Sequence, residues 1–153
     1  MKIEEVSLGD IDQIIALEKR AFQKDAFTSE LIRKLMRRNL FFLKIQDPAS
    51  SELIGFIIVV KDREDRANII NFLINPTYHR KGYGSLLLRT TLQKIRNFRE
   101  ITRVVLNVKT DNLAAIKLYE SHQFQIKKKI DNYYKSGDSS FLMRRDFQKQ
   151  KIK

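Results

Sequence analysis

Residues 74–85 read Ile74-Asn75-Pro76-Thr77-Tyr78-His79-Arg80-Lys81-Gly82-Tyr83-Gly84-Ser85, and they hold two of the five glycines of the chain. The stretch lies between an apolar run typical of a strand, 67–74, and a run with helical spacing, 86–98. A turn of this kind exposes unpaired backbone N–H groups at a helix N-terminus, where the helix dipole also favours an anion. We therefore predict an anion-binding turn, with an ordinary strand–helix turn as the alternative.

Two common nucleotide motifs do not fit this turn. The dinucleotide fingerprint needs a third glycine where this chain has Leu87. The mononucleotide loop needs a Gly-Lys-Ser/Thr ending, which is absent. The turn is instead predicted to bind an anion through its backbone, because glycine leaves no Cβ in the path of a phosphate.

The segments on both sides of the turn predict a mixed α/β fold. Short links join the strands expected at 40–45, 53–60 and 67–74, so an antiparallel meander is expected, with a charged turn over 61–66. The strand–helix–strand order of 67–108 predicts a parallel, right-handed crossover. Further strands are expected at 2–6, 101–108, 124–130 and 140–144, and further helices after Asp10, after Thr28 or Ser29, and at 112–122.

Composition limits the class of protein. The 153 residues suit one domain, expected at 1–147, followed by a basic tail at 148–153. The chain has no cysteine and two histidines, so we expect no disulfide, no cysteine nucleophile and no metal. The formal net charge of +12 favours anionic partners, although a generally basic surface is an equally good reading.

Targeting signals are not evident. The N-terminus has no apolar h-region, and no apolar run approaches the roughly 18–20 residues of a spanning helix. We therefore expect a soluble, cytoplasmic protein without a membrane partner.

With a second block downstream, the glycine turn resembles the GNAT superfamily of acyl-CoA-dependent N-acyltransferases. The superfamily pattern Gln/Arg-x-x-Gly-x-Gly/Ala aligns with 79–84, and the second block is Leu106-Asn107-Val108, the run 112–120 and Phe124. The resemblance implies a mixed central sheet of about seven strands with about four helices. It also implies an antiparallel N-terminal meander, and fourth and fifth strands that run parallel and splay around the acyl-CoA.

Within that superfamily the chain resembles the ribosomal-protein-type N-terminal acetyltransferases and their archaeal relatives. Their Asn-x-x-Val-x-Pro pattern is matched by Asn71-Phe72-Leu73-Ile74-Asn75-Pro76, and their Tyr-Tyr pair by Tyr133-Tyr134. The resemblance implies that a peptide lies between 23–28 and 131–139. It also implies acetyl-CoA as co-substrate, a protein or peptide N-terminus as acceptor, and a ribosome-associated chain as one form of that acceptor.

The resemblance assigns roles residue by residue. Contacts to acetyl-CoA are implied for Phe72, Leu73, Ile74, His79, Arg80, Lys81, Gly82, Tyr83, Gly84, Ser85, Asn112 and Tyr119. Tyr119 is the implied general acid for the leaving thiolate, with a packed core tyrosine as the alternative. Acceptor contacts are assigned to Phe27, Asn107, Tyr133 and Tyr134. For Asn112 the alternative is a helix cap.

Three positions depart from the relatives' pattern. His79 replaces Gln/Arg, Gln123 replaces a glycine after the last helix, and Asn107 replaces the relatives' catalytic glutamate. An α-amine has a pKa of about 7.7–8.0 and a lysine amine about 10.4, so an enzyme without that carboxylate suits an α-amine better. Glu18, Glu64 and Asp65 are alternative carboxylates that could relay a proton through water.

Other functions stay open from the sequence. A GNAT enzyme could acetylate a polyamine, an amino acid, an aminoglycoside or a protein lysine. The small cations would be poorly steered by a protein of charge +12. A basic nucleic-acid-binding module is the alternative from another class, but no zinc spacing, RNA-binding aromatic signature or helix-turn-helix pattern supports it.

Overall fold

The computed structural model describes residues 1–148. Seven strands form one sheet in the order β1-β2-β3-β4-β5-β7-β6. The strands are β1 (Lys2–Glu5), β2 (Phe41–Gln46), β3 (Leu53–Arg63), β4 (Arg66–Ile74), β5 (Arg103–Lys109), β6 (Gln125–Ile130) and β7 (Ser140–Asp146). The helices are α1 (Ile11–Phe22), α2 (Ser29–Arg37), α3 (Tyr83–Arg96) and α4 (Leu113–Ser121), with short 3-10 turns at Leu8–Asp10, Gln23–Asp25 and Pro76–Tyr78.

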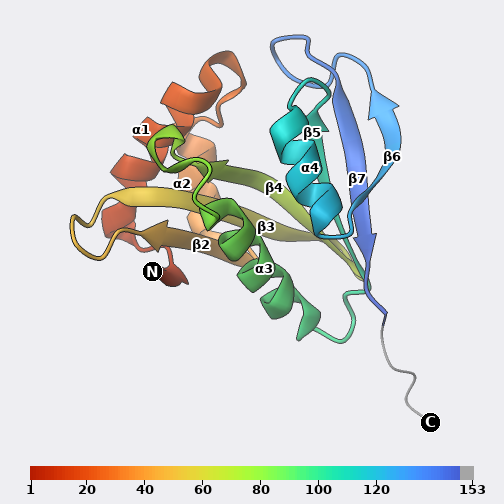
Figure 1. The fold of residues 1–153 in the computed structure, drawn as a ribbon, viewed down its shortest axis with the longest axis horizontal. Coiled ribbons are helices and arrows are strands. Elements are labelled where there is room, and N and C mark those ends of the chain that lie inside the picture. The colour runs from red at the N-terminus through yellow and green to blue at the C-terminus, as the bar shows by residue number, and fades with distance from the viewer. Residues whose placement is uncertain (149–153) are drawn as a thin grey trace.

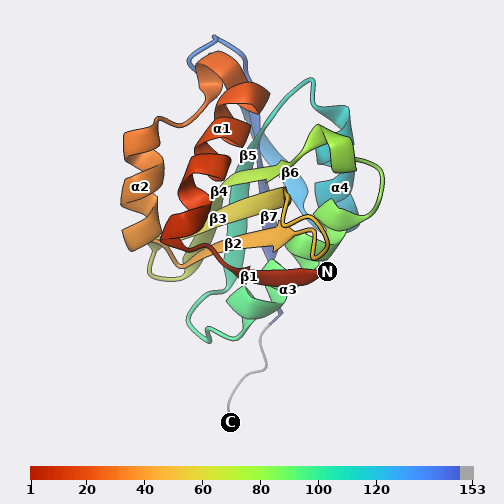
Figure 2. The ribbon, with the colours of Figure 1, turned by 90° about the vertical axis from the view of Figure 1, so that its left-hand side faces the viewer.

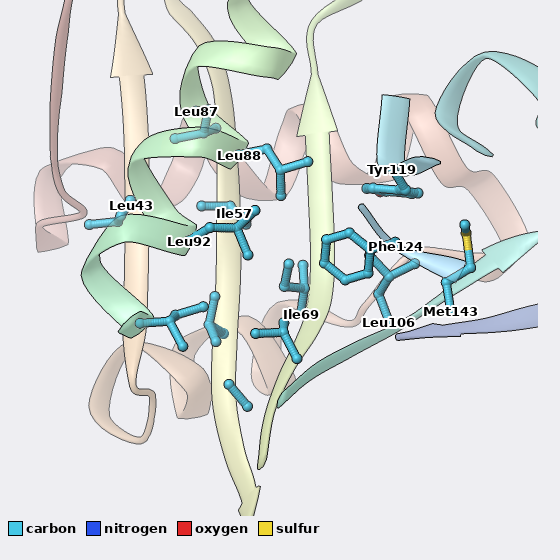
Figure 3. Packing of buried hydrophobic residues seen from close by; sticks show 14 of the residues in the cluster. Leu43, Ile57, Ile69, Leu87, Leu88, Leu92, Leu106, Tyr119, Phe124 and Met143 are labelled. Carbon is cyan, nitrogen blue, oxygen red and sulfur yellow. The ribbon is translucent and has the colours of Figure 1, made fainter. Parts of the chain in front are cut away.

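The sheet is covered on both faces. Helices α1 and α2 lie on one face, and α3 and α4 lie on the other (Figures 1 and 2). Each side has its own apolar core, one centred on Phe56, Ile14 and Ile32, the other on Ile57 and the leucines of α3. Figure 3 shows Leu92 of α3 beside Ile57 of the sheet, and Leu87, Leu88 and Leu43 belong to the same buried cluster. The packing of these leucines fixes α3 against the sheet. The glycine turn lies at the N-terminal end of α3, so its position relative to the sheet is fixed as well.

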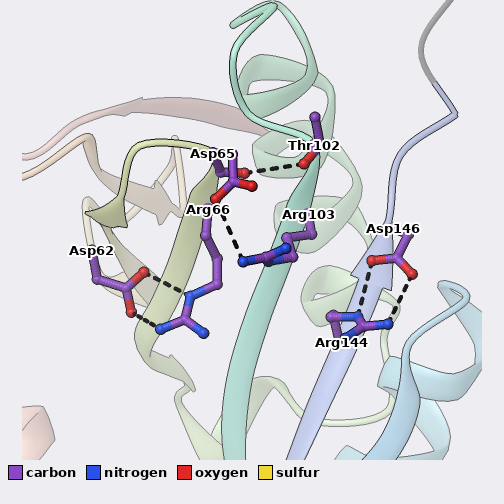
Figure 4. Close-up of polar contacts among 7 residues, drawn as sticks. All are labelled: Asp62, Asp65, Arg66, Thr102, Arg103, Arg144 and Asp146. Atoms are coloured by element: carbon purple, nitrogen blue, oxygen red, sulfur yellow. Dashed lines mark hydrogen bonds and ion pairs between the residues drawn. The ribbon is translucent and has the colours of Figure 1, made fainter.

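The antiparallel meander is confirmed, but its second turn is shorter than expected. Strand β3 continues to Arg63, so the predicted charged turn over 61–66 is wrong in extent. Arg66 donates to both carboxylate oxygens of Asp62, at 2.9 and 2.8 Å, and so holds charged residues within the ladder (Figure 4).

Strands β4 and β5 run parallel and then separate. Their register runs from Arg66↔Arg103 to Ile69↔Leu106 and goes no further. Beside Ile69 the β3–β4 register shifts, since Ile58 pairs with Asn71 and Val59 with Ile69. The bulge at Ile70 bends β4, as bulges do next to functional sites. Residues 71–74 of β4 therefore keep a strand partner only on the β3 side.

Two helix ends follow the expected capping and one does not. The Thr28 hydroxyl accepts from the Leu31 N–H at 3.1 Å and caps α2. The carboxylate of Asp10 does not cap α1, contrary to the prediction, because it accepts from Ser7 and from the ammonium of Lys44 at 2.7 Å. After α4 the chain turns at Gln123 with φ 71°, so a residue other than glycine adopts the left-handed turn.

No helix within residues 1–148 is long and apolar enough to span a lipid bilayer. The expected basic tail, 148–153, lies outside the described residues apart from its first residue.

Candidate active site

The glycine turn joins β4 to α3 and points backbone donors outward. Gly82 precedes α3 with φ 82°, and its carbonyl accepts the first helical bond, from the N–H of Leu86 at 3.1 Å. The N–H groups of Tyr83, Gly84 and Ser85 therefore lie in the first helical turn, where no carbonyl of the helix can reach them. Arg80 also has positive φ, 63°, and backbone of this kind forms concave sites for anions.

Side-chain hydrogen bonds stabilise the turn and the residues that lead into it. The Asn75 side chain accepts from the Thr77 N–H at 3.2 Å, and the Tyr78 hydroxyl donates to Glu52 at 2.8 Å. The carboxylates of Glu52 and Asp47 raise the pKa of Tyr78 to about 12, so the phenol stays a donor. The Nε2 atom of His79 bonds the carbonyl of Ile74 at 2.7 Å. The side chain of His79 thus shapes the turn, and a contact of its ring to phosphate stays a prediction.

Gly84 brings the turn, β4 and α4 into contact. A Cβ added to Gly84 would lie 3.5 Å from Leu118, 3.6 Å from Ile74 and 3.9 Å from Phe72. Phe72 in turn lies against Tyr119, with ring centroids 6.2 Å apart. The predicted contacts from both sequence blocks therefore gather around the end of β4.

Tyr119 is buried in α4 but keeps a free hydroxyl. Its ring packs edge-on against Phe124, with centroids 5.9 Å apart (Figure 3). Within residues 1–148 no group accepts or donates a hydrogen bond at its hydroxyl. Burial raises the pKa of Tyr119 above its ordinary value, and the nearby Tyr134 adds to the effect. A neutral phenol without an internal partner is suited to donate to a ligand.

Two predicted cofactor contacts have internal partners. The Asn112 side chain accepts from the Ala115 N–H at 3.2 Å, so the capping alternative is observed. The Ser85 hydroxyl lies 2.9 Å from Nε2 of His122. Further contacts from the amide nitrogen of Asn112 and the hydroxyl of Ser85 to acetyl-CoA stay predictions.

A cavity of about 450 Å³ opens where β4 and β5 separate. All four predicted acceptor residues, Phe27, Asn107, Tyr133 and Tyr134, line it. Its remaining walls come from the α1–α2 connector, the first turn of α2, β4 and the β6–β7 connector, through Asp25, Ala26, Thr28, Leu31, Asn68, Ile69, Ile70 and Lys135. The cavity therefore unites residues that the sequence separates by more than a hundred positions.

The amide of Asn107 has a defined orientation. Its Oδ1 atom accepts from the hydroxyl of buried Ser140 at 2.9 Å. The amide nitrogen is then the group left for the cavity, and it can only donate. Asn107 can orient an acceptor or a water, but it cannot take a proton from an amine near neutral pH.

The alternative carboxylates lie in different environments. Glu18 is 1% exposed and accepts from the Phe27 N–H and from the Asn71 side chain, both at 2.8 Å. Burial raises the pKa of Glu18 above its ordinary value. Asp65 lies at the β3–β4 turn, where its carboxylate pairs with Arg103 at 3.5 Å (Figure 4). Neither Asp65 nor Glu64 lines the cavity.

Sequence reasoning missed Asp25. Its carboxylate lines the cavity and bonds Lys109 and Ser136, which are 84 and 111 positions away. The only local signal was an acidic residue in a connector already assigned to peptide binding. Nothing in the spacing of the chain indicated its partners.

These residues fit acetyl-CoA. The turn would offer a pyrophosphate its backbone N–H groups and the charges of Arg80 and Lys81. The free edge of β4 would offer its peptide groups to the amides of a pantetheine arm. The ring of Tyr119 packs against the ring of Phe72, which belongs to that edge.

Residues 10–124 match the acetyltransferase (GNAT) family. The chain belongs to this family. An N-alpha-acetyltransferase from Saccharolobus solfataricus is 25% identical over 150 residues, which cover 90% of this chain and 88% of the relative. The ribosomal protein bS18-alanine N-acetyltransferase of Escherichia coli is 35% identical over 74 residues, which cover 48% of this chain and 49% of the relative.

Solved structures agree with the family. Ard1 from Thermoplasma volcanium superposes with a TM-score of 0.87 at 28% identity, covering 97% of this GNAT chain and 98% of the other. Arabidopsis thaliana NAA60 in complex with acetyl-CoA shares the fold, with a TM-score of 0.83 at 18% identity over 95% of this chain and 99% of the other. The protein is therefore a GNAT-type N-acetyltransferase, and acetyl-CoA is its co-substrate.

Proposed function

We propose that this enzyme acetylates the N-terminal α-amine of a protein or peptide, by direct attack in a ternary complex. The observation that carries the proposal is the cavity at the β4–β5 opening, with Phe27, Asn107, Tyr133 and Tyr134 on its walls. Two connectors bound the cavity, and they overlap the segments 23–28 and 131–139 between which the resemblance implies a bound peptide. The names of the relatives from Saccharolobus solfataricus and Escherichia coli support the same class of acceptor.

The chemistry requires little from an enzyme base. The nitrogen lone pair of a neutral amine attacks the thioester carbonyl carbon, the C–N bond forms, and the C–S bond then breaks. The amine loses one proton to water, and the leaving sulfur gains one. An α-amine, with a pKa of about 7.7–8.0, is substantially neutral at physiological pH, so the donor amide of Asn107 is compatible with it.

We assign Tyr119 to the leaving sulfur. Its phenol is neutral, buried and without an internal partner among residues 1–148. Donation to the developing thiolate is an interaction that grows during the reaction, which is the kind that accelerates the chemical step. The backbone of 72–74 and the turn 79–85 hold the acetyl-CoA in our assignment.

A ribosomal protein or a chain emerging from the ribosome is the acceptor that we favour. The net charge of +12 would bring the enzyme to the ribosome's anionic surface, whereas it would repel a free polyamine.

A peptide library tests this proposal. Peptides with free and blocked N-termini, each with and without an internal lysine, are incubated with acetyl-CoA and the enzyme. We expect acetylation of every class with a free α-amine and of neither blocked class. Acetylation of blocked peptides that contain lysine would assign the enzyme to side-chain amines. Activity on polyamines or aminoglycosides with none on peptides would assign it to small amines.

A further inference from the structure

Asp25 joins the two connectors that bound the acceptor cavity. Its carboxylate accepts hydrogen bonds from the Ser136 N–H and the Ser136 hydroxyl, both at 2.9 Å. It also accepts from the ammonium of Lys109, at 2.5 Å. Asp25 belongs to the connector between α1 and α2, whereas Ser136 belongs to the connector between β6 and β7. Figures 1 and 2 both place these connectors beside each other at the same end of the molecule.

Lys109 extends the junction toward the cavity wall. Its ammonium lies 3.2 Å from the carboxylate of Asp138 and 5.3 Å from the ring centroid of Tyr134. The ring of Tyr134 lines the cavity. The Asp25 side chain is only 5% exposed, so its bonds are largely shielded from water. Charge-assisted bonds of this kind are shorter and stronger than neutral ones.

The α1–α2 connector has a second anchor. Buried Glu18 holds the Phe27 N–H and, through Asn71, ties it to β4. Residues 25–27 are thus fixed at one end to the sheet and at the other to the β6–β7 connector. The aromatic walls Phe27 and Tyr134 are set by these two attachments.

We propose that Asp25 is a positioning residue that locks the two connectors together, so that the acceptor enters a preformed cavity. The proposal rests on the acceptor assignment given above, and it goes beyond it by naming the junction of Asp25, Lys109 and Ser136. Asp25 acts through the walls that it holds and does not touch the reacting atoms. Without the junction, the acceptor would have to order both connectors on binding, and its affinity would fall by that cost.

The ion pair between Asp25 and Lys109 persists at neutral pH. The Lys109 ammonium and the Ser136 donors hold the pKa of Asp25 at about 2, and the same contact raises the pKa of Lys109. Both partners therefore keep their charges across the range in which the enzyme would be assayed.

Kinetics of Asp25→Asn and Lys109→Met test the proposal. We expect the KM for a free N-terminal peptide to rise at least 10-fold in each variant, which corresponds to about 1.4 kcal/mol of binding. We expect kcat to change less than 3-fold and the Kd for acetyl-CoA to stay within 2-fold. Asp12→Asn is the matched control, because that carboxylate is 96% exposed and, among residues 1–148, pairs only with Arg33, at 3.7 Å. An unchanged KM in both variants would overturn the proposal.

Amide hydrogen exchange tests the junction without any acceptor. In Asp25→Ala, the amides of 131–139 should exchange at least 10-fold faster than in wild type, since Ser136 N–H loses its acceptor. Asp12→Asn should leave their exchange unchanged. Equal exchange in Asp25→Ala and wild type would overturn the junction. If wild type binds acetyl-CoA but acetylates no free N-terminus, the acceptor assignment fails and this proposal fails with it, whereas accelerated exchange would still establish the junction.

Discussion

Replacing Tyr119 by Phe removes one oxygen from the site and little else. The ring contacts with Phe72 and Phe124 would remain, at centroid separations of 6.2 and 5.9 Å. Within residues 1–148 the hydroxyl has no hydrogen-bond partner to lose. The free energy of unfolding should therefore fall by less than the roughly 0.5–1.5 kcal/mol that a lost internal hydrogen bond costs.

The expected effect on turnover is far larger. A general acid contributes about 10²–10⁴-fold, and a simple hydrogen bond to the thiolate about 10-fold, so kcat should fall by about 10- to 10⁴-fold. In free energy of activation this is about 1.4–5.5 kcal/mol. Burial raises the pKa of Tyr119, so no ionisation of this phenol should appear in the kcat profile below about pH 10.

Three measurements on Tyr119→Phe decide the matter. Urea unfolding gives stability, calorimetric titration gives the Kd for acetyl-CoA, and saturating kinetics on a free N-terminal peptide give kcat. We expect the first two to match wild type while kcat falls. A weaker Kd with normal kcat would show that the hydroxyl binds the co-substrate. A normal kcat with a normal Kd would refute the role of Tyr119 in leaving-group departure.

Further predictions concern Gly84, Asn107 and Glu18. Gly84→Ala should keep the fold because its Cβ would make ordinary contacts at 3.5–3.9 Å, whereas Gly84→Val should abolish acetyl-CoA binding. At 100 times the wild-type Kd, acetyl-CoA should add about 2.7 kcal/mol to the free energy of unfolding of wild type and almost nothing to that of the valine variant. An equal gain in both would contradict the placement of the pyrophosphate at this turn. For wild type, the pH profile of kcat/KM should follow the ionisation of the acceptor amine, with an inflection that moves between two peptides of different N-terminal pKa. Asn107→Glu should raise activity at lower pH. An inflection fixed near pH 6–7 in wild type would indicate an enzyme base instead. Folding raises the pKa of Glu18 above 4.5. Wild type should therefore be most stable relative to Glu18→Gln below pH 4.5, and it should lose that advantage as pH rises through the folded pKa. A difference in urea-unfolding free energy that is flat between pH 3.5 and 7 would contradict this.

Periodicity and turn chemistry predicted most elements of the fold. The strand–helix–strand order of 67–108 correctly predicted the parallel crossover, whereas anion binding at the glycine turn stays a prediction. Helix α1 begins directly after Asp10 as predicted, but the Asp10 carboxylate makes no capping bond because Lys44, far along the chain, pairs with it in a largely buried site. The predicted length of β3 was wrong because Asp62 forms an ion pair with Arg66 of the neighbouring strand. This ion pair offsets the low strand propensity of charged residues.

The acceptor cavity was predictable only in part. Phe27, Asn107, Tyr133 and Tyr134 could be assigned because a resemblance to relatives carries positions as well as residue types. The orientation of the Asn107 amide depends on Ser140, and the attachment of Phe27 depends on Glu18. Such bonds join residues whose separation along the chain carries no pattern, so a single sequence does not indicate them.

The free edge of β4 limits how this enzyme could be redesigned. Peptide groups of residues 71–74 are the same whatever side chains they carry, so under our assignment exchanging Phe72 or Ile74 would alter packing without removing main-chain contacts to a pantetheine arm. Only proline, which lacks the N–H, would delete one outright. Under the same assignment, an engineer who wants a longer acyl group would instead change side chains around the cavity, such as Tyr134. Affinity for the carrier and choice of the transferred group would then depend on different parts of this scaffold.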